Sequence, residues 1–379
     1  MILSIEDLRA RARRRIPRAI FDYADGGSYQ ETTLRANTAD LDAIALRPRV
    51  MMDVSDIKLA TTLAGAEASM PLAIAPTGLC GLYHADGEIL GARAAAAFGI
   101  PFCLSTMSIC SIEDVREATK QPFWFQQYLM RDRGFNQELI ERAIAAQCSA
   151  LMLTLDLQVI AERRRDPRNG LSIPPRVTLR NALDVATKPV WALKVLFGKR
   201  RTFGNLVGRI GGTSGMKTLA EWTQTQFDPS ANWRDVEWVR SRWSGRLILK
   251  GVMDAEDARF ALAAGADAVV VSNHGGRQLD GAPSSIAVLP EIVDAIGGRC
   301  EVLFDGGIRS GQDLAKALAL GARGGLIGKS FLFALAAGGQ AGVTRALEII
   351  RDELRVTLAL TGITEVGSAG AHMLRLPVR

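Results

Sequence analysis

Eight short apolar segments, most of them separated by helix-like stretches, constrain the fold of this 379-residue chain more than any other feature. Each segment is bounded by glycine, proline or polar residues, which is typical of buried β-strands. The predicted strands are Pro71–Ala75, Phe102–Leu104, Phe123–Gln126, Ala150–Leu155, Arg246–Lys250, Ala268–Val271, Glu301–Phe304 and Gly324–Ile327. The predicted helices include Gly87–Phe98, Ser111–Ala118, Phe135–Gln147, Asp254–Ala264, Ser285–Ile296 and Ser310–Leu320. This alternation predicts an α/β fold, a (β/α)₈ TIM barrel.

A doubly wound sheet is the competing α/β fold. It would place a glycine-rich fingerprint after the first strand, and Pro76-Thr77-Gly78 follows instead. We therefore expect one domain, with an N-terminal helical segment (1–69), a barrel (70–345) and a C-terminal helix and tail (346–379). The long interruption between the fourth and fifth strands, roughly 158–234, is expected to carry elements of its own.

Charge and cysteine content narrow the class of protein. The five cysteines are scattered without CxxC spacing, so we expect neither a disulfide framework nor a metal site. The arginine-rich stretch Ser4–Arg15 is interpreted as a capped helix with a solvated face, not as a nucleic-acid-binding segment. Residues 185–220 contain seven basic and no acidic residues, and without them the net charge of +6 falls to 6 − 7 = −1. The basicity of the chain is therefore local.

The predicted strand ends carry polar side chains, and in a barrel the C-terminal strand ends build the active site. After the sixth strand come His274, a proton-transferring imidazole, and Arg277, whose planar fork suits a carboxylate. This pair predicts a site for a small organic acid. Asp156, at the end of the fourth strand, is a candidate to orient His274, although it could equally cap a loop or pair with Arg163–Arg165.

The last two strand ends predict an anion site. Gly306-Gly307 with Arg309, and Gly328-Lys329 before a helix, offer backbone amides, a helix N-terminus and two cations. A phosphate there, with polar groups around the remaining rim, suits flavin mononucleotide (FMN) better than a dinucleotide. Lys250 would then lie near the electron-rich ring.

These motifs resemble those of the FMN-dependent α-hydroxy acid dehydrogenases and oxidases, over nearly the whole chain. The most specific are Ser272–Asp280 and Asp305–Gly311. Residues 75–81, 104–106 and 227–230 are most similar to the bacterial membrane-associated L-lactate dehydrogenases, followed by mandelate dehydrogenases.

The resemblance implies a role for each matched residue. His274 would be the general base with Asp156 as its partner, and Tyr128 would bind the substrate hydroxyl. Tyr23, Arg163 and Arg277 would hold the substrate carboxylate. The cofactor-binding residues would be Thr77, Gly78, Ser105, Gln126, Thr154, Lys250, Ser272, Asp305, Gly307, Arg309, Gly328 and Lys329. Of these, Lys250 would face the flavin N1/O2 edge, and the last four, Gly307, Arg309, Gly328 and Lys329, would hold the phosphate. Lys329 stands where the family usually has arginine.

The resemblance also implies partners and a location. Residues 185–220 would attach the enzyme peripherally to the cytoplasmic side of the inner membrane, and basic and apolar side chains together suit an anionic lipid surface. The alternatives are a solvated basic loop or a strip buried by a partner subunit. L-lactate would be oxidised to the 2-oxo acid, with electrons passing to a quinone, in a homotetramer.

Several rival functions remain at this stage. L-mandelate is an alternative substrate, and an oxygen-using oxidase is an alternative enzyme, although Gly78 favours a dehydrogenase. A flavin-free barrel that binds a sugar phosphate would be colourless. A non-catalytic lipid-binding scaffold would show no measurable change when His274 is replaced by alanine.

Overall fold

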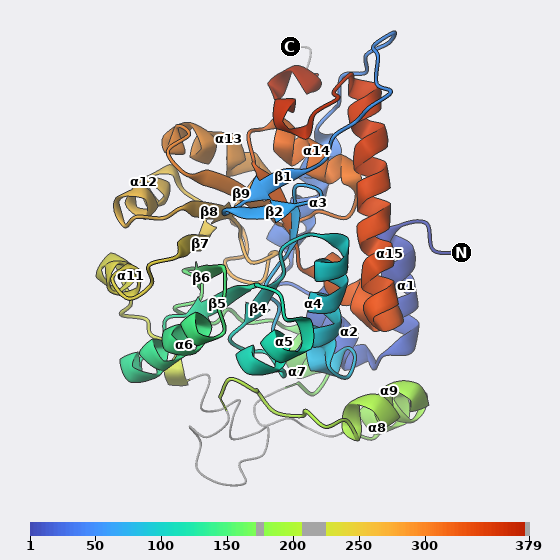
Figure 1. Cartoon of the computed structure of the whole chain (residues 1–379). Coiled ribbons are helices and arrows are strands. Elements are labelled where there is room, and N and C mark those ends of the chain that lie inside the picture. The colour runs from blue at the N-terminus through green and yellow to red at the C-terminus, as the bar shows by residue number, and fades with distance from the viewer. Residues whose placement is uncertain (172–177, 207–224, 376–379) are drawn as a thin grey trace.

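The chain forms the predicted barrel (Figure 1). The computed structural model describes residues 1–171, 178–206 and 225–375. Eight parallel strands follow one another in the order β3-β10-β9-β8-β7-β6-β5-β4, and the parallel bridge between Ile74 and Phe102 joins the two outer strands. Their bounds are β3 Leu72–Ile74, β4 Cys103–Ser105, β5 Trp124–Tyr128, β6 Ala150–Thr154, β7 Arg246–Val252, β8 Ala268–Val271, β9 Glu301–Asp305 and β10 Gly324–Ile327.

Helices cover the outside of the barrel. They are α4 Gly87–Phe98, α5 Ile112–Thr119, α6 Arg133–Ala145, α11 Trp233–Arg240, α12 Ala255–Ala263, α13 Ser285–Ile296, α14 Gly311–Ala319 and α15 Lys329–Thr361. A capping box formed by Ser111 and Asp114 is present at the start of α5. The stretch predicted as 135–147 begins two residues earlier, because the Asp132 side chain caps α6 by accepting a hydrogen bond from the Phe135 amide at 2.9 Å.

The N-terminal segment is not purely helical. Besides α1 Ile5–Arg15, α2 Arg18–Asp25 and α3 Thr32–Ala43, it contains the hairpin β1 Thr61–Leu63 and β2 Ala66–Ala68. Leu63, Ala64 and Ala68 join the inward-facing side chains of the strands in one buried cluster. The hairpin thus closes the end of the barrel at which the strands begin, and the opposite end is left for the site.

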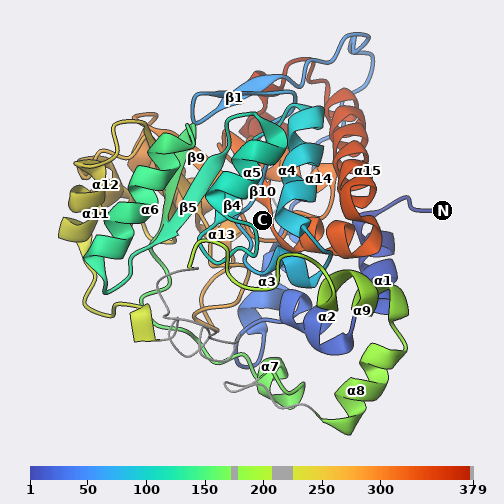
Figure 2. The ribbon, with the colours of Figure 1, turned by 60° about the horizontal axis from the view of Figure 1, so that its bottom comes forward.

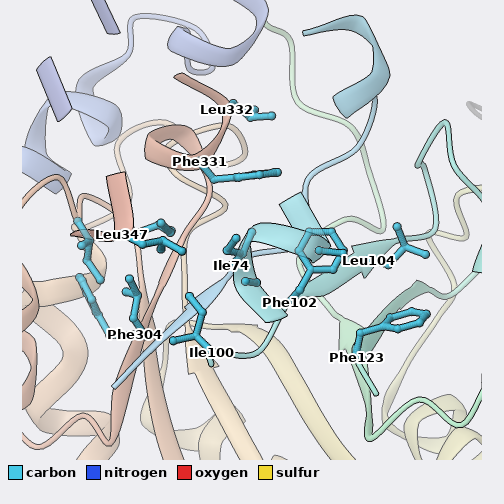
Figure 3. Packing of buried hydrophobic residues seen from close by; sticks show 14 of the residues in the cluster. Ile74, Ile100, Phe102, Leu104, Phe123, Phe304, Phe331, Leu332 and Leu347 are labelled. Atoms are coloured by element: carbon cyan, nitrogen blue, oxygen red, sulfur yellow. The ribbon is translucent and has the colours of Figure 1, made fainter. Parts of the chain in front are cut away.

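The outer core is packed between strands and helices (Figure 3). Phe331, near the start of α15, is fully buried and meets the ring of Phe102 edge-on at a centroid distance of 6.3 Å. Gly91 of α4 lies against both rings. Helix α15 is kinked at Gly338-Gly339, so its first part packs at the barrel mouth and its second part runs beside α1.

The interruption between β6 and β7 carries helices, as expected. They are α7 Arg165–Arg168, α8 Leu179–Ala186 and α9 Pro189–Leu196. Helices α7 and α8 pack against α2, and all of them lie on one side of the barrel (Figure 2). Short 3₁₀ turns, η1 Cys80–Leu82, η2 Val366–Ser368 and η3 Ala371–Met373, complete the described elements.

Candidate active site

A cavity of about 400 Å³ opens at the C-terminal ends of the strands. Of the predicted site residues, thirteen line it: Tyr23, Thr77, Gly78, Tyr128, Arg163, Lys250, His274, Arg277, Asp305, Gly307, Arg309, Gly328 and Lys329. The other five do not line it but lie at strand ends or directly after them: Ser105, Gln126, Thr154, Asp156 and Ser272. Of these, Thr154 and Asp156 line a second cavity of about 270 Å³, which shares Leu157 with the first. The barrel therefore brings together residues that are up to about 300 positions apart in sequence.

His274 and Asp156 form a pair across two strand ends. The His274 Nδ1 atom lies 3.1 Å from Asp156 Oδ1 and 3.3 Å from Oδ2. Because an ionised carboxylate only accepts hydrogen bonds, Nδ1 carries the proton and Nε2 is the basic nitrogen. His274 adopts a left-handed backbone conformation, with φ of 58°, which is unusual for a non-glycine residue and frequent at functional sites.

The ionisation of Asp156 is set by its neighbours. Burial alone would raise the pKa of its carboxyl group, but the charge and hydrogen bond of His274 and the charge of Lys250 outweigh burial. The pKa of Asp156 is therefore held below its ordinary value. An ionised Asp156 stabilises the imidazolium that forms when His274 accepts a proton.

Two guanidinium groups and one phenol lie close together in the cavity. The guanidinium carbons of Arg277 and Arg163 lie 4.7 and 4.9 Å from the centroid of the Tyr23 ring. Arg277 Nη1 donates to the Tyr23 carbonyl, and Arg163 Nε donates to Asp166 at 2.8 Å. Burial and the neighbouring charge of Arg163 lower the pKa of Arg277. Two cations held this close favour an anionic ligand between them.

Tyr128, at the end of β5, lies near the His274–Asp156 pair. Its ring meets Phe227 edge-on at a centroid distance of 5.6 Å. Burial and the charge of Asp156 raise the pKa of its phenol, so the hydroxyl stays protonated and available as a hydrogen-bond donor.

Lys250 is fixed by a buried triangle of polar groups. Its Nζ atom lies 2.8 Å from both Ser272 Oγ and Asp305 Oδ2, and Ser272 Oγ donates to Asp305 Oδ2 at 2.8 Å. Burial alone would lower the pKa of the Lys250 ammonium group. The negative charges of Asp305 and Asp156 outweigh the effect of burial and raise this pKa. Lys250 is thus a preorganised cation facing the cavity.

The predicted phosphate cradle has the backbone that such a site needs. Gly306 and Gly307 have φ of 117° and 107°, which only glycine adopts readily. A Cβ atom on Gly307 would also run into the backbone carbonyl of Asn37. Arg309 lines the same wall, and Gly328 precedes the first turn of α15. Amides, a helix N-terminus and Arg309 can hold a phosphate.

A buried amide at the ends of β4 and β5 fits the flavin ring. Ser105 Oγ donates to Gln126 Oε1 at 3.0 Å, and this leaves the buried Gln126 Nε2 with no partner among the described residues. A buried amide donor costs free energy unless something accepts from it. The polar edge of a flavin supplies such an acceptor, and the phosphate cradle and Lys250 fit the rest of FMN.

Sequence reasoning missed two contributors. Asn37, from α3, lines the cavity and exchanges two hydrogen bonds with Asn273, at 2.8 and 2.7 Å. Asp166 orients Arg163. No local pattern marks Asn37, because its partner lies 236 positions away. Asp166 lies three residues after Arg163, so its spacing offered a signal.

Comparison with known proteins agrees with this geometry. Residues 12–376 match the family described as FMN-dependent dehydrogenase. An L-lactate dehydrogenase of Caulobacter vibrioides is 50% identical over 99% of this chain and 98% of its own, and one of Ectopseudomonas mendocina is 47% identical over 99% of both chains.

Solved structures give the same result. A monotopic membrane protein, (S)-mandelate dehydrogenase, superposes with a TM-score of 0.94 and 37% identity over 99% of both chains. Mandelate oxidase superposes with a TM-score of 0.83 and 38% identity, over 99% of this chain and 98% of its own. The match over nearly the whole chain confirms FMN as the cofactor. The chain belongs to the FMN-dependent dehydrogenase family.

Proposed function

We propose that the protein oxidises L-lactate to the 2-oxo acid and passes the electrons to a membrane quinone. The observation that carries this proposal is the placement of His274, paired with Asp156, in one cavity with the Arg277–Arg163–Tyr23 cluster and the FMN cradle. A base next to two cations suits a substrate whose hydroxyl group is adjacent to a carboxylate. The relatives at 47–50% identity are named L-lactate dehydrogenases.

In this mechanism the Arg277–Arg163–Tyr23 cluster orients the substrate. Arg277 and Arg163 bind the carboxylate, and the Tyr23 hydroxyl donates to it. This fixes the α-carbon toward His274 and places the hydroxyl group within reach of Tyr128. Orientation of this kind removes most of the entropic cost of bringing the reacting groups together.

His274 Nε2 then takes a proton from the substrate, and ionised Asp156 stabilises the imidazolium. The substrate gives up two electrons and two protons in total, and His274 takes one of the protons. Bound FMN would supply the acceptor for the electron pair and the other proton. Lys250, next to its predicted N1/O2 edge, offers a fixed positive charge where negative charge develops.

A larger acid such as L-mandelate is the second candidate substrate. Leu157, Ile160 and Phe227 add an apolar wall to the cavity, which a phenyl group would fill better than a methyl group. The mandelate dehydrogenase and oxidase with which the fold superposes support this candidate.

We also propose that the insertion attaches the enzyme peripherally to the cytoplasmic face of the inner membrane. Six large apolar side chains in α8, in α9 and directly after α9 are exposed to solvent by 46–79%: Leu179, Leu183, Val190, Leu193, Leu196 and Phe197. An exposed apolar surface of this kind, beside lysines and arginines, suits an anionic lipid surface.

The predicted membrane segment is divided in the structure. Trp191, Val195 and Phe203 point inward and are buried, and the Trp191 indole donates to the Leu82 carbonyl at 2.6 Å. Arg200 pairs with Asp86 and Asp114. Residues 207–220 of the segment lie outside the described residues. Within the described ranges, no helix is both long and apolar enough to cross a bilayer. The homotetramer implied by the family resemblance remains part of this proposal.

Steady-state kinetics test the substrate and the acceptor together. Reduction of a soluble quinone analogue is measured with L-lactate, L-mandelate and their D-enantiomers. The proposal predicts the highest kcat/KM with L-lactate and little turnover with either D-acid. A higher kcat/KM with L-mandelate would transfer the assignment to the second candidate. Faster turnover with oxygen than with the quinone would make the enzyme an oxidase.

A further inference from the structure

Lys329 lies in the predicted phosphate cradle, but its side chain points elsewhere. Its Nζ atom donates to the backbone carbonyls of Ala24 and Gly26 at 2.7 Å, and to that of Asp25 at 3.3 Å. Three acceptors around one ammonium use all three of its protons. The same side chain passes the loop after β8, where a Cβ atom on Gly275 would lie 3.5 Å from Lys329 Cε.

These carbonyls belong to the C-terminal end of α2. The last carbonyl groups of a helix lack partners within the helix and carry its negative partial charge. Here Arg277 donates a hydrogen bond to the carbonyl of Tyr23, and Lys329 donates to the next three carbonyls along the chain. Two cations from two different strand ends thus clamp the last turn of α2, the turn that carries the Tyr23 side chain.

The clamp is buried and lies among other charges. Burial and the charge of Arg277 lower the pKa of Lys329, and Arg309 acts in the same direction, while Asp25 and Glu31 oppose them. Asp25 is itself held by Arg9 at 2.6 Å and Arg165 at 3.1 Å. The three carbonyl acceptors nevertheless fix the position of the Lys329 side chain against α2.

We propose that Lys329 is a positioning residue of the substrate site, and that its ammonium holds α2, and with it Tyr23, against Arg277. This inference rests on the proposed function of the site. It differs from the sequence-based prediction, in which the Lys329 side chain holds the cofactor phosphate. The amides at the start of α15 and Arg309 remain to hold the phosphate.

The test separates the two roles by comparing Lys329→Met with Arg309→Met. For each variant, FMN affinity is measured by titrating the apoprotein with FMN, and KM and kcat are measured with L-lactate. Because loosening a substrate-orienting group affects substrate binding directly, Lys329→Met should raise the KM about tenfold and change the FMN Kd less than about threefold. Arg309→Met should weaken FMN binding and leave the KM nearly unchanged.

A double-mutant cycle with Tyr23→Phe adds a readout that general destabilisation would not move. If Lys329 acts through Tyr23, Lys329→Met should raise the KM clearly less in the Tyr23→Phe background than in the wild type. Lys329→Gln, which keeps two of the three N–H donors without the charge, should give an intermediate KM and serves as the test if Lys329→Met does not fold.

Two results would overturn the proposal. Weakened FMN binding by Lys329→Met with an unchanged KM would make the side chain a phosphate ligand, and an unchanged KM together with an unchanged Kd would leave it no role in the site. Failure of the proposed function is distinguishable, because it would appear first as wild-type protein that binds FMN but does not react with L-2-hydroxy acids.

Discussion

At the scale of single residues, the central pair is His274 and Asp156. Replacing Asp156 by Asn keeps the shape but removes the charge and allows the wrong imidazole tautomer. We expect the rate of flavin reduction to fall about 10²–10⁴-fold, with the larger part of the loss in kcat. Stopped-flow absorbance under anaerobic conditions measures this rate. Asp53→Asn, at an exposed position, is the control, and a rate for Asp156→Asn equal to that of the control would exclude the proposed pairing.

Asp25 makes a prediction about acid stability. Burial raises the pKa of this carboxyl group, but the hydrogen bond and charge of Arg9 outweigh burial and lower it. A carboxyl group whose pKa is lower in the folded state stabilises that state at pH values above its unfolded pKa, which is about 4. This stabilisation is lost as the pH falls from the unfolded pKa through the folded pKa. The Tm of Asp25→Asn should therefore lie below that of the wild type at pH 6, and the difference between the two Tm values should shrink toward pH 3. A gap of constant size would contradict this assignment.

Most of the residues that the sequence assigned to the site line one cavity, because most of them follow a predicted strand and barrel geometry brings strand ends together. The sequence could not predict how the side chains pair. The Lys250–Ser272–Asp305 triangle and the hydrogen bonds of Lys329 to α2 depend on tertiary distances. Local pattern carries no information about either.

At the scale of elements, the packing of α4 against α15 is tight. A Cβ atom on Gly91 would lie 2.7 Å from two atoms of the fully buried Phe331 ring, which Phe102 prevents from moving away. Gly91→Ala should therefore destabilise the protein by about 1–3 kcal/mol, despite the better helix propensity of alanine. Thermal or urea unfolding measures this change. Gly367→Ala, where the added methyl group meets nothing within 4 Å, should be nearly neutral.

Helix α9 makes a prediction about the membrane. Leu193 and Phe197 are 64% and 73% exposed and Trp191 is only 9% exposed, so the outer face can be changed without disturbing the inner one. The double change Leu193→Ser and Phe197→Ser should weaken cosedimentation with anionic phosphatidylglycerol vesicles and leave turnover with a soluble acceptor intact. Val356→Ser on α15, at another exposed apolar position, is the control. Equal binding by all three proteins would argue against α9 as the attachment site.

Elements were predictable to different degrees. Every barrel strand was placed within a few residues, because short apolar runs bounded by glycine or polar residues are a strong local signal. Helices α2 and α3 were not identified individually. Helix α2 has only eight residues, and its N-cap, Pro17, offers no side-chain hydrogen bond. Its position is fixed by contacts with α7, α8 and α15, which are remote in sequence.

At the scale of the whole molecule, the two ends of the barrel have different tasks. The β1–β2 hairpin plugs one end with apolar side chains, and the other end collects the ionisable groups around the cavity. The insertion with α8 and α9 projects at the edge of the molecule away from this hairpin (Figure 1). Substrate chemistry and the proposed membrane surface are thus carried by loops and helices on a closed, rigid scaffold.

The most direct test of the central claim is an anaerobic visible spectrum of the FMN-loaded protein before and after addition of L-lactate. We expect L-lactate to bleach the oxidised flavin band of the wild type, D-lactate to leave it unchanged, and His274→Ala to retain the flavin without being bleached. A wild-type spectrum unchanged by L-lactate and L-mandelate alike, or rapid bleaching of His274→Ala, would contradict this mechanism.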